Sequence, residues 1–427
     1  MELVENIPYG LVSCFLDGRQ VTVLALSDAR FAVRVREEVA PGEIELKFLH
    51  FDKAEWETVK LSCFRLVSVM NTSCGLRMTV ETEDTSYRNH TRRALMELAR
   101  YVRLKGLDDD EELARELTGC PGGETVLRTL SDQKRKWFSA PLAQVCPGER
   151  ELCLSIDRPD SYDRFMRMEF GAFQTDFFAR SFLSGCPLFD KRADRVYIGN
   201  PHCIHLFPEN PMELTERARL EKLGVTVVLP PLRESASGFL PKIMPVITSS
   251  AADEIAVNDW GTLLALRGCG KRLLLGTCLN RRRKDPRMKY KPGIAAGAEI
   301  MGQNDLNDDE WRNKLISLGI TRFEFESCLY PQVYPAGRVS LHLPFYLTNG
   351  SHGCLIAASC EGTDPGLGRD EETCPRYCLS RARLYADELH LAGRYNALFG
   401  VDTDILTDNA YAERALCGVD RIVAELL

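Results

Sequence analysis

The segment Glu213–Leu229 reads ELTERARLEKLGVTVVL and carries the signals that decide the fold. Its first part has the mixed apolar and charged spacing of an amphipathic helix. Gly224 follows, and a glycine directly after the last helical turn is a common C-terminal cap. Val225–Leu229 is a short, β-branched, apolar run, which is typical of a buried strand. The segment therefore predicts a helix that leads through a tight turn into a buried strand.

The same order of strand, helix and closing turn recurs on both sides of this segment. Strands are predicted at Arg195–Ile198, Glu254–Val257, Arg272–Leu275, Thr321–Phe325 and Val339–Leu343, and helices around Trp260–Leu266 and at Asp308–Leu318. Strands that alternate with helices are typical of parallel βα units. We expect an α/β fold in which residues 190–427 form a TIM-like βα barrel. Two amphipathic helices are expected to finish it, the last with Ala412, Leu416 and Val423 on one face.

The N-terminal region has a different pattern. Residues 1–88 contain short β-branched and aromatic runs separated by turn signals such as Asp17-Gly18, which predicts a small all-β barrel. A helix with Leu95 and Leu98 on its apolar face follows, so the first domain is expected to span residues 1–104. Residues 105–189 are interpreted as a helical linker or lobe.

Composition narrows the class of protein. The chain has 427 residues, 54 Lys and Arg against 61 Asp and Glu, a net charge of −7, and 16 cysteines. No stretch approaches the roughly 20 apolar residues of a membrane-spanning helix, and the first residues, MELVENIPYG, lack the pattern of a secretory signal. We therefore expect a cytoplasmic protein without a membrane span. In that setting, many thiols favour a metal or iron–sulfur site over a disulfide framework.

Position along the predicted barrel sorts the cysteines. Chemistry in βα barrels lies where strands end. Cys203 follows one predicted strand, and Cys354 and Cys360 follow a later one. Cys374 and Cys378 span about one helical turn, so both sulfurs can face one metal. Thiolates at this spacing suit zinc and iron–sulfur clusters alike, and the remaining cysteines are interpreted as ordinary buried thiols.

Several polar residues also end predicted strands and are expected to line the same opening: Asn258, Asp259, Asn280, Glu326 and His342. Asp259 is a candidate to accept a hydroxyl or amine of the substrate, and His342 is a candidate proton carrier near neutral pH. Asn258 and Asn280 are candidates for substrate binding. Two structural alternatives stay open: Asp259 also fits a helix N-cap, and His342 also fits a hydrogen-bonded histidine that lines the barrel.

The segment 281–291, RRRKDPRMKYK, contains seven basic residues in eleven. It directly follows a strand end, so it is expected to project from the active-site face. There Arg281, Arg282, Arg283 and Lys284 would bind phosphate, a carboxylate-bearing substrate or RNA. The alternative is a solvated loop, which is what most charge runs are.

Four segments in order resemble the U32 family of collagenase-like peptidases over about residues 190–390: VYIGNPHC (196–203), EIAVNDWG (254–261), LGTCLN (275–280) and LPFY (343–346). The branch they resemble contains the oxygen-independent ubiquinone hydroxylation proteins. The resemblance implies a [4Fe–4S] cluster held by one cysteine after the first barrel strand and three late ones. Carried over, these are Cys203, Cys374, Cys378 and Cys354, whose CLIAAS context is similar to the family's pattern. Cys360 stays open as the alternative to Cys354.

The implied activity is oxygen-independent hydroxylation, or a related modification, of a small aromatic molecule or RNA. The family name implies proteolysis instead, but the sequence contains neither a Gly-x-Ser-x-Gly nor a His-Glu-x-x-His motif. We therefore keep a metal-assisted peptidase only as an alternative. A non-catalytic scaffold with a structural cluster or zinc is another.

The segment LALSDARFAV (24–33) gives the N-terminal domain a weaker resemblance to PilZ-like barrels. Ala25 stands where that family has an aspartate, Arg30 stands where it has a glycine, and an upstream Arg-x₃-Arg is missing. Those residues would hold cyclic di-GMP, so we do not expect this nucleotide to bind. The resemblance instead implies a degenerate barrel that contacts a protein partner.

Overall fold

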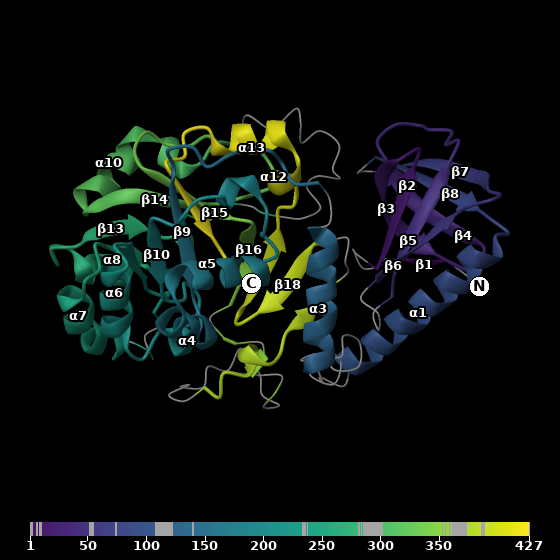
Figure 1. The fold of residues 1–427 in the computed structure, drawn as a ribbon. Coiled ribbons are helices and arrows are strands. Elements are labelled where there is room, and N and C mark those ends of the chain that lie inside the picture. The colour runs from purple at the N-terminus through teal and green to yellow at the C-terminus, as the bar shows by residue number, and fades with distance from the viewer. Residues whose placement is uncertain are drawn as a thin grey trace. The chain divides into compact units, whose positions relative to one another are not determined.

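The computed structural model describes residues 3–5, 7, 11–50, 55–72, 75–106, 123–138, 141–232, 236, 238–280, 282, 284, 302–351, 353–354, 356–357, 360, 374–385 and 389–426. The chain divides into two compact units (Figure 1). The first comprises Met1–Pro121, Arg287–Ala295 and Leu384–Leu389, and the second comprises Gly122–Pro286, Ala296–Arg383 and His390–Leu427.

The first unit contains an antiparallel sheet and one long helix. The strands are β1 (Val4–Glu5), β2 (Val12–Leu16), β3 (Arg19–Leu26), β4 (Arg30–Val35), β5 (Ile44–His50), β6 (Glu55–Lys60), β7 (Arg65–Thr72) and β8 (Gly75–Glu81). Their order is β6-β5-β2-β3-β4-β8-β7, with β1 paired to β3. The region is all-β as expected, but the pairs between described residues form an open order that ends at β6 and β7, where we expected a closed barrel.

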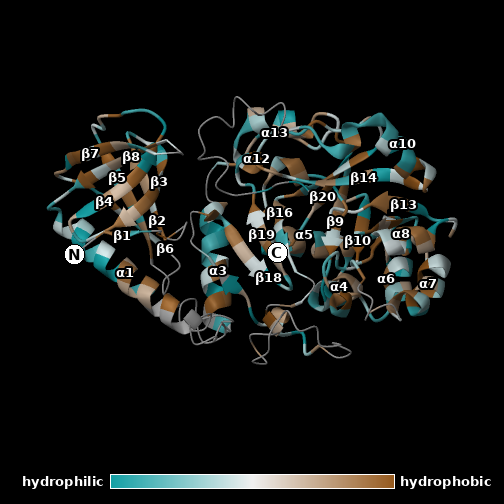
Figure 2. Cartoon of the chain, turned by 180° about the vertical axis from the view of Figure 1, so that it is seen from behind, coloured by the Kyte–Doolittle hydropathy of each residue, from teal (hydrophilic) through white to brown (hydrophobic). Residues whose placement is uncertain are grey.

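Helix α1 (Thr85–Gly106) completes this unit. Figure 2 shows hydrophobic and hydrophilic residues alternating along it, as expected for a helix with one buried face. Tyr87 is fully buried, and its hydroxyl donates a 2.8 Å hydrogen bond to the Ser27 carbonyl. Asp84 accepts a bond from the Tyr87 backbone N–H at 3.1 Å and so caps the helix. Apolar packing around Phe31 and Phe48 forms the core of the unit.

The second unit is built on a closed barrel of eight parallel strands (Figure 1). In barrel order they are β9 (Glu151–Ile156), β10 (Arg195–Ile198), β11 (Gly224–Val228), β12 (Glu254–Val257), β13 (Arg272–Leu275), β14 (Ile320–Glu326), β15 (Val339–Leu343) and β20 (Arg421–Ala424). This arrangement confirms an α/β fold with a closed parallel barrel. The six strands from β10 to β15 lie within a residue or two of the predicted ranges.

The first and last barrel strands differ from the predictions. The barrel begins at Glu151, so the predicted boundary at residue 190 is too late and part of the expected lobe belongs to the barrel. At the other end, helix α13 (Asn409–Leu416) is followed by strand β20, where we expected one continuous helix. Val423 thus lies in a strand that pairs with both β15 and β9 and closes the barrel.

The helices of this unit are α3 (Glu124–Trp137), α4 (Pro159–Arg167), α5 (Phe170–Arg180), α6 (Pro211–Leu220), α7 (Phe239–Ser249), α8 (Trp260–Leu266), α10 (Asp309–Ser317), α12 (Asp404–Thr407) and α13, with short 3₁₀ turns η1 (Pro187–Phe189), η2 (Ile204–Leu206), η5 (Asp305–Asn307) and η6 (Tyr377–Leu379). Residues 327–338, between β14 and β15, contain no helix. Among the residues described, no helix is both long and apolar enough to cross a membrane.

An insertion separates the last two barrel strands. It carries an antiparallel sheet in the order β16 (Phe345–Gly350), β19 (Ala397–Val401), β18 (Leu391–Arg394) and β17 (Arg383–Leu384). Because β16 directly follows β15, the insertion starts at the C-terminal end of the seventh strand. This end of a βα barrel is the one that carries active sites. We call it the barrel mouth, formed by the residues that directly follow the strands: Asp157, Gly199, Leu229, Asn258, Gly276, Ser327, Pro344 and Glu425.

Candidate metal centre

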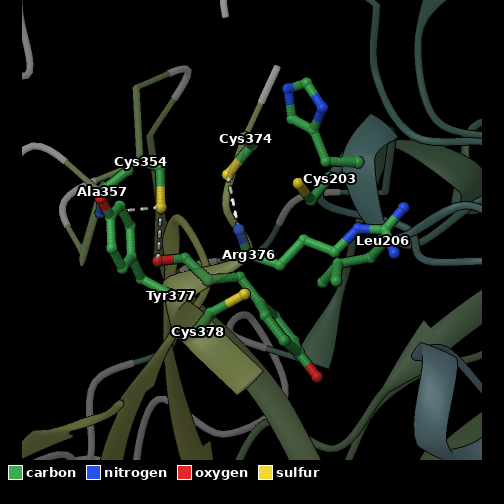
Figure 3. A pocket seen from close by; sticks show the side chains of 10 residues that line it. Cys203, Leu206, Cys354, Ala357, Cys374, Arg376, Tyr377 and Cys378 are labelled. Carbon is green, nitrogen blue, oxygen red and sulfur yellow. Dashed lines mark hydrogen bonds between the residues drawn. The ribbon is translucent and has the colours of Figure 1, made fainter. Parts of the chain in front are cut away.

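Four cysteines from distant parts of the chain line one pocket (Figure 3). Cys203 follows β10, Cys354 follows β16, and Cys374 and Cys378 lie before and within η6. We call this the cysteine pocket; its lining also includes His205, Leu206, Ala357, Arg376, Tyr377 and Tyr395. The structure thus brings together the four residues for which the sequence predicts a shared metal site.

The loop after β10 is shaped to present Cys203. Gly199 has a φ of +123°, and a Cβ on it would lie 2.2 Å from the Val228 carbonyl oxygen, so only glycine fits. The fully buried Asn200 then accepts hydrogen bonds from the backbone N–H groups of His202 at 2.8 Å and Cys203 at 2.9 Å. These bonds fix the turn, so the Gly-Asn-Pro-His-Cys segment directs its cysteine into the pocket.

On the insertion side, backbone N–H groups point at two of the sulfurs. The Ala357 N–H donates to Cys354 Sγ and the Arg376 N–H donates to Cys374 Sγ, each at 3.4 Å (Figure 3). Arg376 has a φ of +59°, a left-handed conformation that this turn requires. Its guanidinium pairs with Glu209 at 3.0 Å, which links the insertion to the loop after β10. N–H groups directed at sulfur favour thiolates and are a recognised means of tuning iron–sulfur clusters.

The electrostatics of the pocket favour neutral thiols unless a cation is present. Burial raises the pKa of Cys203 to about 12, and the neighbouring cysteines add to the rise. Burial and Cys354 likewise raise the pKa of Cys378 to about 12, against an opposing effect of Arg394. Four thiols cannot all ionise here without positive charge among them. Metal binding supplies that charge, because it replaces the thiol protons.

The four cysteines are donors that suit either a cluster or a single metal ion. Within the described ranges, no three His, Cys, Asp or Glu side chains are grouped closely enough to hold one metal ion. In a four-iron cluster each cysteine binds a different iron, so the sulfurs lie further apart than the ligands of one zinc ion. Four cysteines around one pocket are the donor set of such a cluster, and the same set is found in structural zinc sites.

The geometry also bears on the choice between Cys354 and Cys360. Cys354 lines the cysteine pocket, and its sulfur accepts the Ala357 N–H. Cys360 is half-buried and is not part of the lining. Cys354 is therefore the better candidate for the third late ligand.

Asp259 lies at the barrel mouth but serves as a helix cap. One of its carboxylate oxygens accepts the Thr262 N–H at 2.7 Å, and the other accepts the Thr262 hydroxyl at 2.6 Å and the Leu232 N–H at 3.1 Å. The structural alternative, an N-cap for α8, is thus confirmed. With both oxygens engaged, Asp259 has no geometric feature that supports the predicted catalytic role.

His342 lies inside the barrel between two carboxylates. Its Nε2 is 2.7 Å from Glu324 and its Nδ1 is 2.8 Å from Glu425. Burial opposes protonation, but the two hydrogen-bonded carboxylates outweigh it and raise the pKa of His342 to about 9. The ring is therefore an imidazolium at neutral pH. The predicted proton carrier near neutrality is not what this environment favours, whereas the hydrogen-bonded barrel histidine is.

The two asparagines join strand ends to their neighbours. Asn258 is buried; it donates to the Leu229 carbonyl at 2.8 Å and accepts the Cys278 N–H at 3.1 Å. Asn280 donates to the Glu324 carbonyl at 3.0 Å. Both lie near the barrel mouth as expected. Their contacts hold the loops after β11 and β13, and substrate binding by them stays a prediction.

Only part of the basic segment can be assessed. Arg281, Arg283 and residues 285–291 lie outside the described residues. Arg282 donates hydrogen bonds to Gln332 and to backbone carbonyls of the 302–303 loop. Lys284 is buried in an ion pair with Glu326, where burial lowers its pKa to about 8. The alternative of a solvated loop does not hold for Arg282 and Lys284, because other residues of the protein bind both side chains. Binding of phosphate, a carboxylate or RNA by them stays a prediction.

Several residues of this region were not expected from the sequence. Glu324 and Glu425 hold His342, and Tyr395 and Arg394 adjoin the cysteine pocket. Glu425 directly follows β20 near the C-terminus, where the sequence predicts a helix. The insertion strands carry no motif at Arg394 and Tyr395. Only alternation of polar and apolar residues in β14 could have indicated that Glu324 points inward.

Comparison with known proteins adds little. No protein-family model matches the chain, and no curated protein matches it. Among solved structures, an uncharacterized Legionella protein aligns over 26% of this chain and 99% of its own length, at 15% identity and a TM-score of 0.16. A similarity at this level carries no argument about fold or function.

Proposed function

We propose that this protein is an iron–sulfur protein similar to the U32 family, and that Cys203, Cys354, Cys374 and Cys378 hold a [4Fe–4S] cluster. One observation carries the proposal: of the sixteen cysteines, the four that the family resemblance implies as ligands line a single pocket. The N–H groups directed at Cys354 and Cys374 support it.

We further propose that the cluster supports oxygen-independent hydroxylation, or a related modification, of an aromatic small molecule or an RNA base at the barrel mouth. The Gly-Asn-Pro-His-Cys loop supports this placement. His202, the residue before the candidate ligand, lies 3.9 Å from Cys278 of the loop after β13 and stacks edge-on against Phe399. Burial lowers the pKa of His202 to about 3, so it presents a neutral imidazole. A substrate at the strand ends would therefore be close to the cysteine pocket.

Charged side chains of the barrel would interact with a substrate at this mouth. A substrate that enters the barrel would come close to the imidazolium of His342 and to the buried Lys284–Glu326 ion pair. The cluster, when bound, would supply redox chemistry. For the first unit we propose a contact with a protein partner and no binding of cyclic di-GMP.

The test begins with anaerobic purification of the full chain, followed by assays of iron, acid-labile sulfide and visible absorbance. Replacing Cys203, Cys354, Cys374 or Cys378 singly by Ala should remove most of the iron. Replacing Cys14, buried in the first unit, or the exposed Cys417 should leave it unchanged. Cys360→Ala distinguishes the two candidates for the third late ligand.

Each alternative has its own outcome. Equal iron loss from ligand and control variants would mean that the wrong thiols were chosen. Stoichiometric zinc with chelator-sensitive peptide cleavage would favour the metal-assisted peptidase. If the cluster stays intact and substitutions at the barrel mouth leave the modification of the substrate unchanged, the non-catalytic scaffold is favoured.

A further inference from the structure

Arg394, the last residue of β18, is a buried cation beside the cysteine pocket. Its side chain is only 7% exposed, and its Nη2 donates to the Cys378 carbonyl at 3.3 Å. The guanidinium lies 5.4 Å from the centre of the Tyr395 ring, and Tyr395 itself lines the pocket. Arg394 thus contacts two residues of the cysteine pocket, Cys378 and Tyr395.

A second feature of Arg394 is the lack of an ion-pair partner in the described part of the chain. Among the described residues, no carboxylate lies within ion-pair distance of its guanidinium, and its buried Nε has no hydrogen-bond partner. The nearby Asp157 is engaged with Arg158 and with the Tyr395 hydroxyl, each at 3.2 Å. An unpaired buried charge costs several kcal/mol. A residue of this kind implies that an anion is present in the functional state.

Two further basic side chains lie near Arg394. Lys134 of α3 is 6% exposed and Arg158, after β9, is 5% exposed. Both are close enough to act electrostatically on each other and on Arg394. Helix α3 lies beside β18 in Figure 1, and Trp137 stacks on His390 at 5.3 Å. Arg158 has Asp157 and Asp160 as counter-charges, and burial lowers the pKa of Lys134, which favours its neutral amine.

We propose that Arg394 is the counter-cation of the cluster bound by the four cysteines, and that its charge raises the reduction potential of that cluster. The inference rests on the proposed function. A cubane held by four thiolates is an anion in both of its common oxidation states, and the reduced state is the more negative one. A fixed positive charge in a buried site stabilises the reduced state more strongly, because Coulomb interactions there are weakly screened. Arg394 acts through the cluster and is a positioning residue.

The test compares Arg394→Gln, which removes the charge at similar length, with Arg394→Lys, which keeps it. The exposed Arg219 of α6, replaced by Gln, is the matched control for loss of a charge elsewhere on the unit. Midpoint potentials are measured on anaerobically purified full chains by titration with dithionite, followed by electron paramagnetic resonance. Arg394→Gln should lower the midpoint potential by at least about 59 mV, which is a tenfold decrease in the equilibrium constant for one-electron reduction of the cluster. Arg394→Lys and Arg219→Gln should stay close to wild type.

The outcomes separate this inference from the one beneath it. If the wild-type protein contains no cluster, both the proposed cluster and the proposed role of Arg394 are wrong. A wild-type cluster with an unchanged potential in Arg394→Gln overturns the role of Arg394 and leaves the cluster in place. If Arg394→Gln loses the cluster, Arg394→Lys decides: a cluster retained at nearly the wild-type potential supports the counter-cation, whereas equal loss in both variants shows a packing role only.

Discussion

The pair of carboxylates around His342 predicts a histidine that stays charged well above neutral pH. Its pKa is raised from 6.5 to about 9, and one pKa unit corresponds to about 1.4 kcal/mol, so the charged form gains roughly 3 kcal/mol in the folded state. Because the folded pKa exceeds the unfolded one, this stabilisation is fully present below pH 6.5. It is lost as the pH rises through about 9.

Histidine-selective NMR measures this directly. The chain has only seven histidines, and His342→Gln identifies the signal by deleting it. The signal should titrate with a midpoint near 9 in the wild-type protein. Glu324→Gln removes one of the two carboxylates and should lower the midpoint by about one unit or more.

Stability provides the second readout. His342→Gln should lower the thermal midpoint at pH 6, and the deficit should shrink at pH 10, where the wild-type imidazolium has lost its proton. A wild-type midpoint between pH 6 and 7, or a deficit that is the same at both pH values, would refute the reasoning. Either result would mean that His342 is neutral in the folded barrel.

Three further predictions concern the frame around the site. Arg421→Met should cost about 3 kcal/mol, because Glu254, 2.7 Å away and equally buried, loses a partner; adding Glu254→Met should recover part of the lost thermal stability. Gly400→Ala places a Cβ 2.1 Å from the Tyr346 ring and should destabilise by about 1–3 kcal/mol in denaturant unfolding, with relief from Tyr346→Leu. Asp259→Ala should cost about 1 kcal/mol and Asp259→Asn much less, both with normal iron content; loss of iron or equal destabilisation would argue against a simple cap.

The barrel could be predicted because its central strands carry strong local signals. Segments such as Gly224–Val228 are β-branched and follow an amphipathic helix, so their pattern is clear. The predicted glycine cap is wrong: helix α6 ends at Leu220, Lys222 takes the left-handed conformation with a φ of +59°, and Gly224 is the first residue of β11. The sequence does not predict β9 (ELCLSI) or β20 (RIVA), although a predicted strand such as β12 (EIAV) is no longer than either. Each is defined by pairing with strands far away in the sequence. A helix-like spacing from Ala412 to Val423 hid the turn at Gly418, whose φ of +86° ends the helical segment.

The candidate site shows the same division. The spacing of Cys374 and Cys378 is a local property, and the family resemblance implied the other two ligands. The partners of His342 and of Lys284 could not be predicted, because Glu425 and Glu326 reach them only when the barrel closes. The sequence shows Lys284 within a basic run, and only the fold buries it. Arg394 likewise could not be recognised from the sequence, because its contact with Cys378 joins two different elements.

The central claim is that one four-iron cluster is held by Cys203, Cys354, Cys374 and Cys378. Native mass spectrometry of the anaerobically purified chain, compared with the denatured chain, tests it most directly. The predicted difference is the mass of four irons and four sulfides per chain, absent from a variant in which all four cysteines are Ala. A difference equal to one zinc, no difference at all, or an intact cluster in the fourfold variant would contradict the claim.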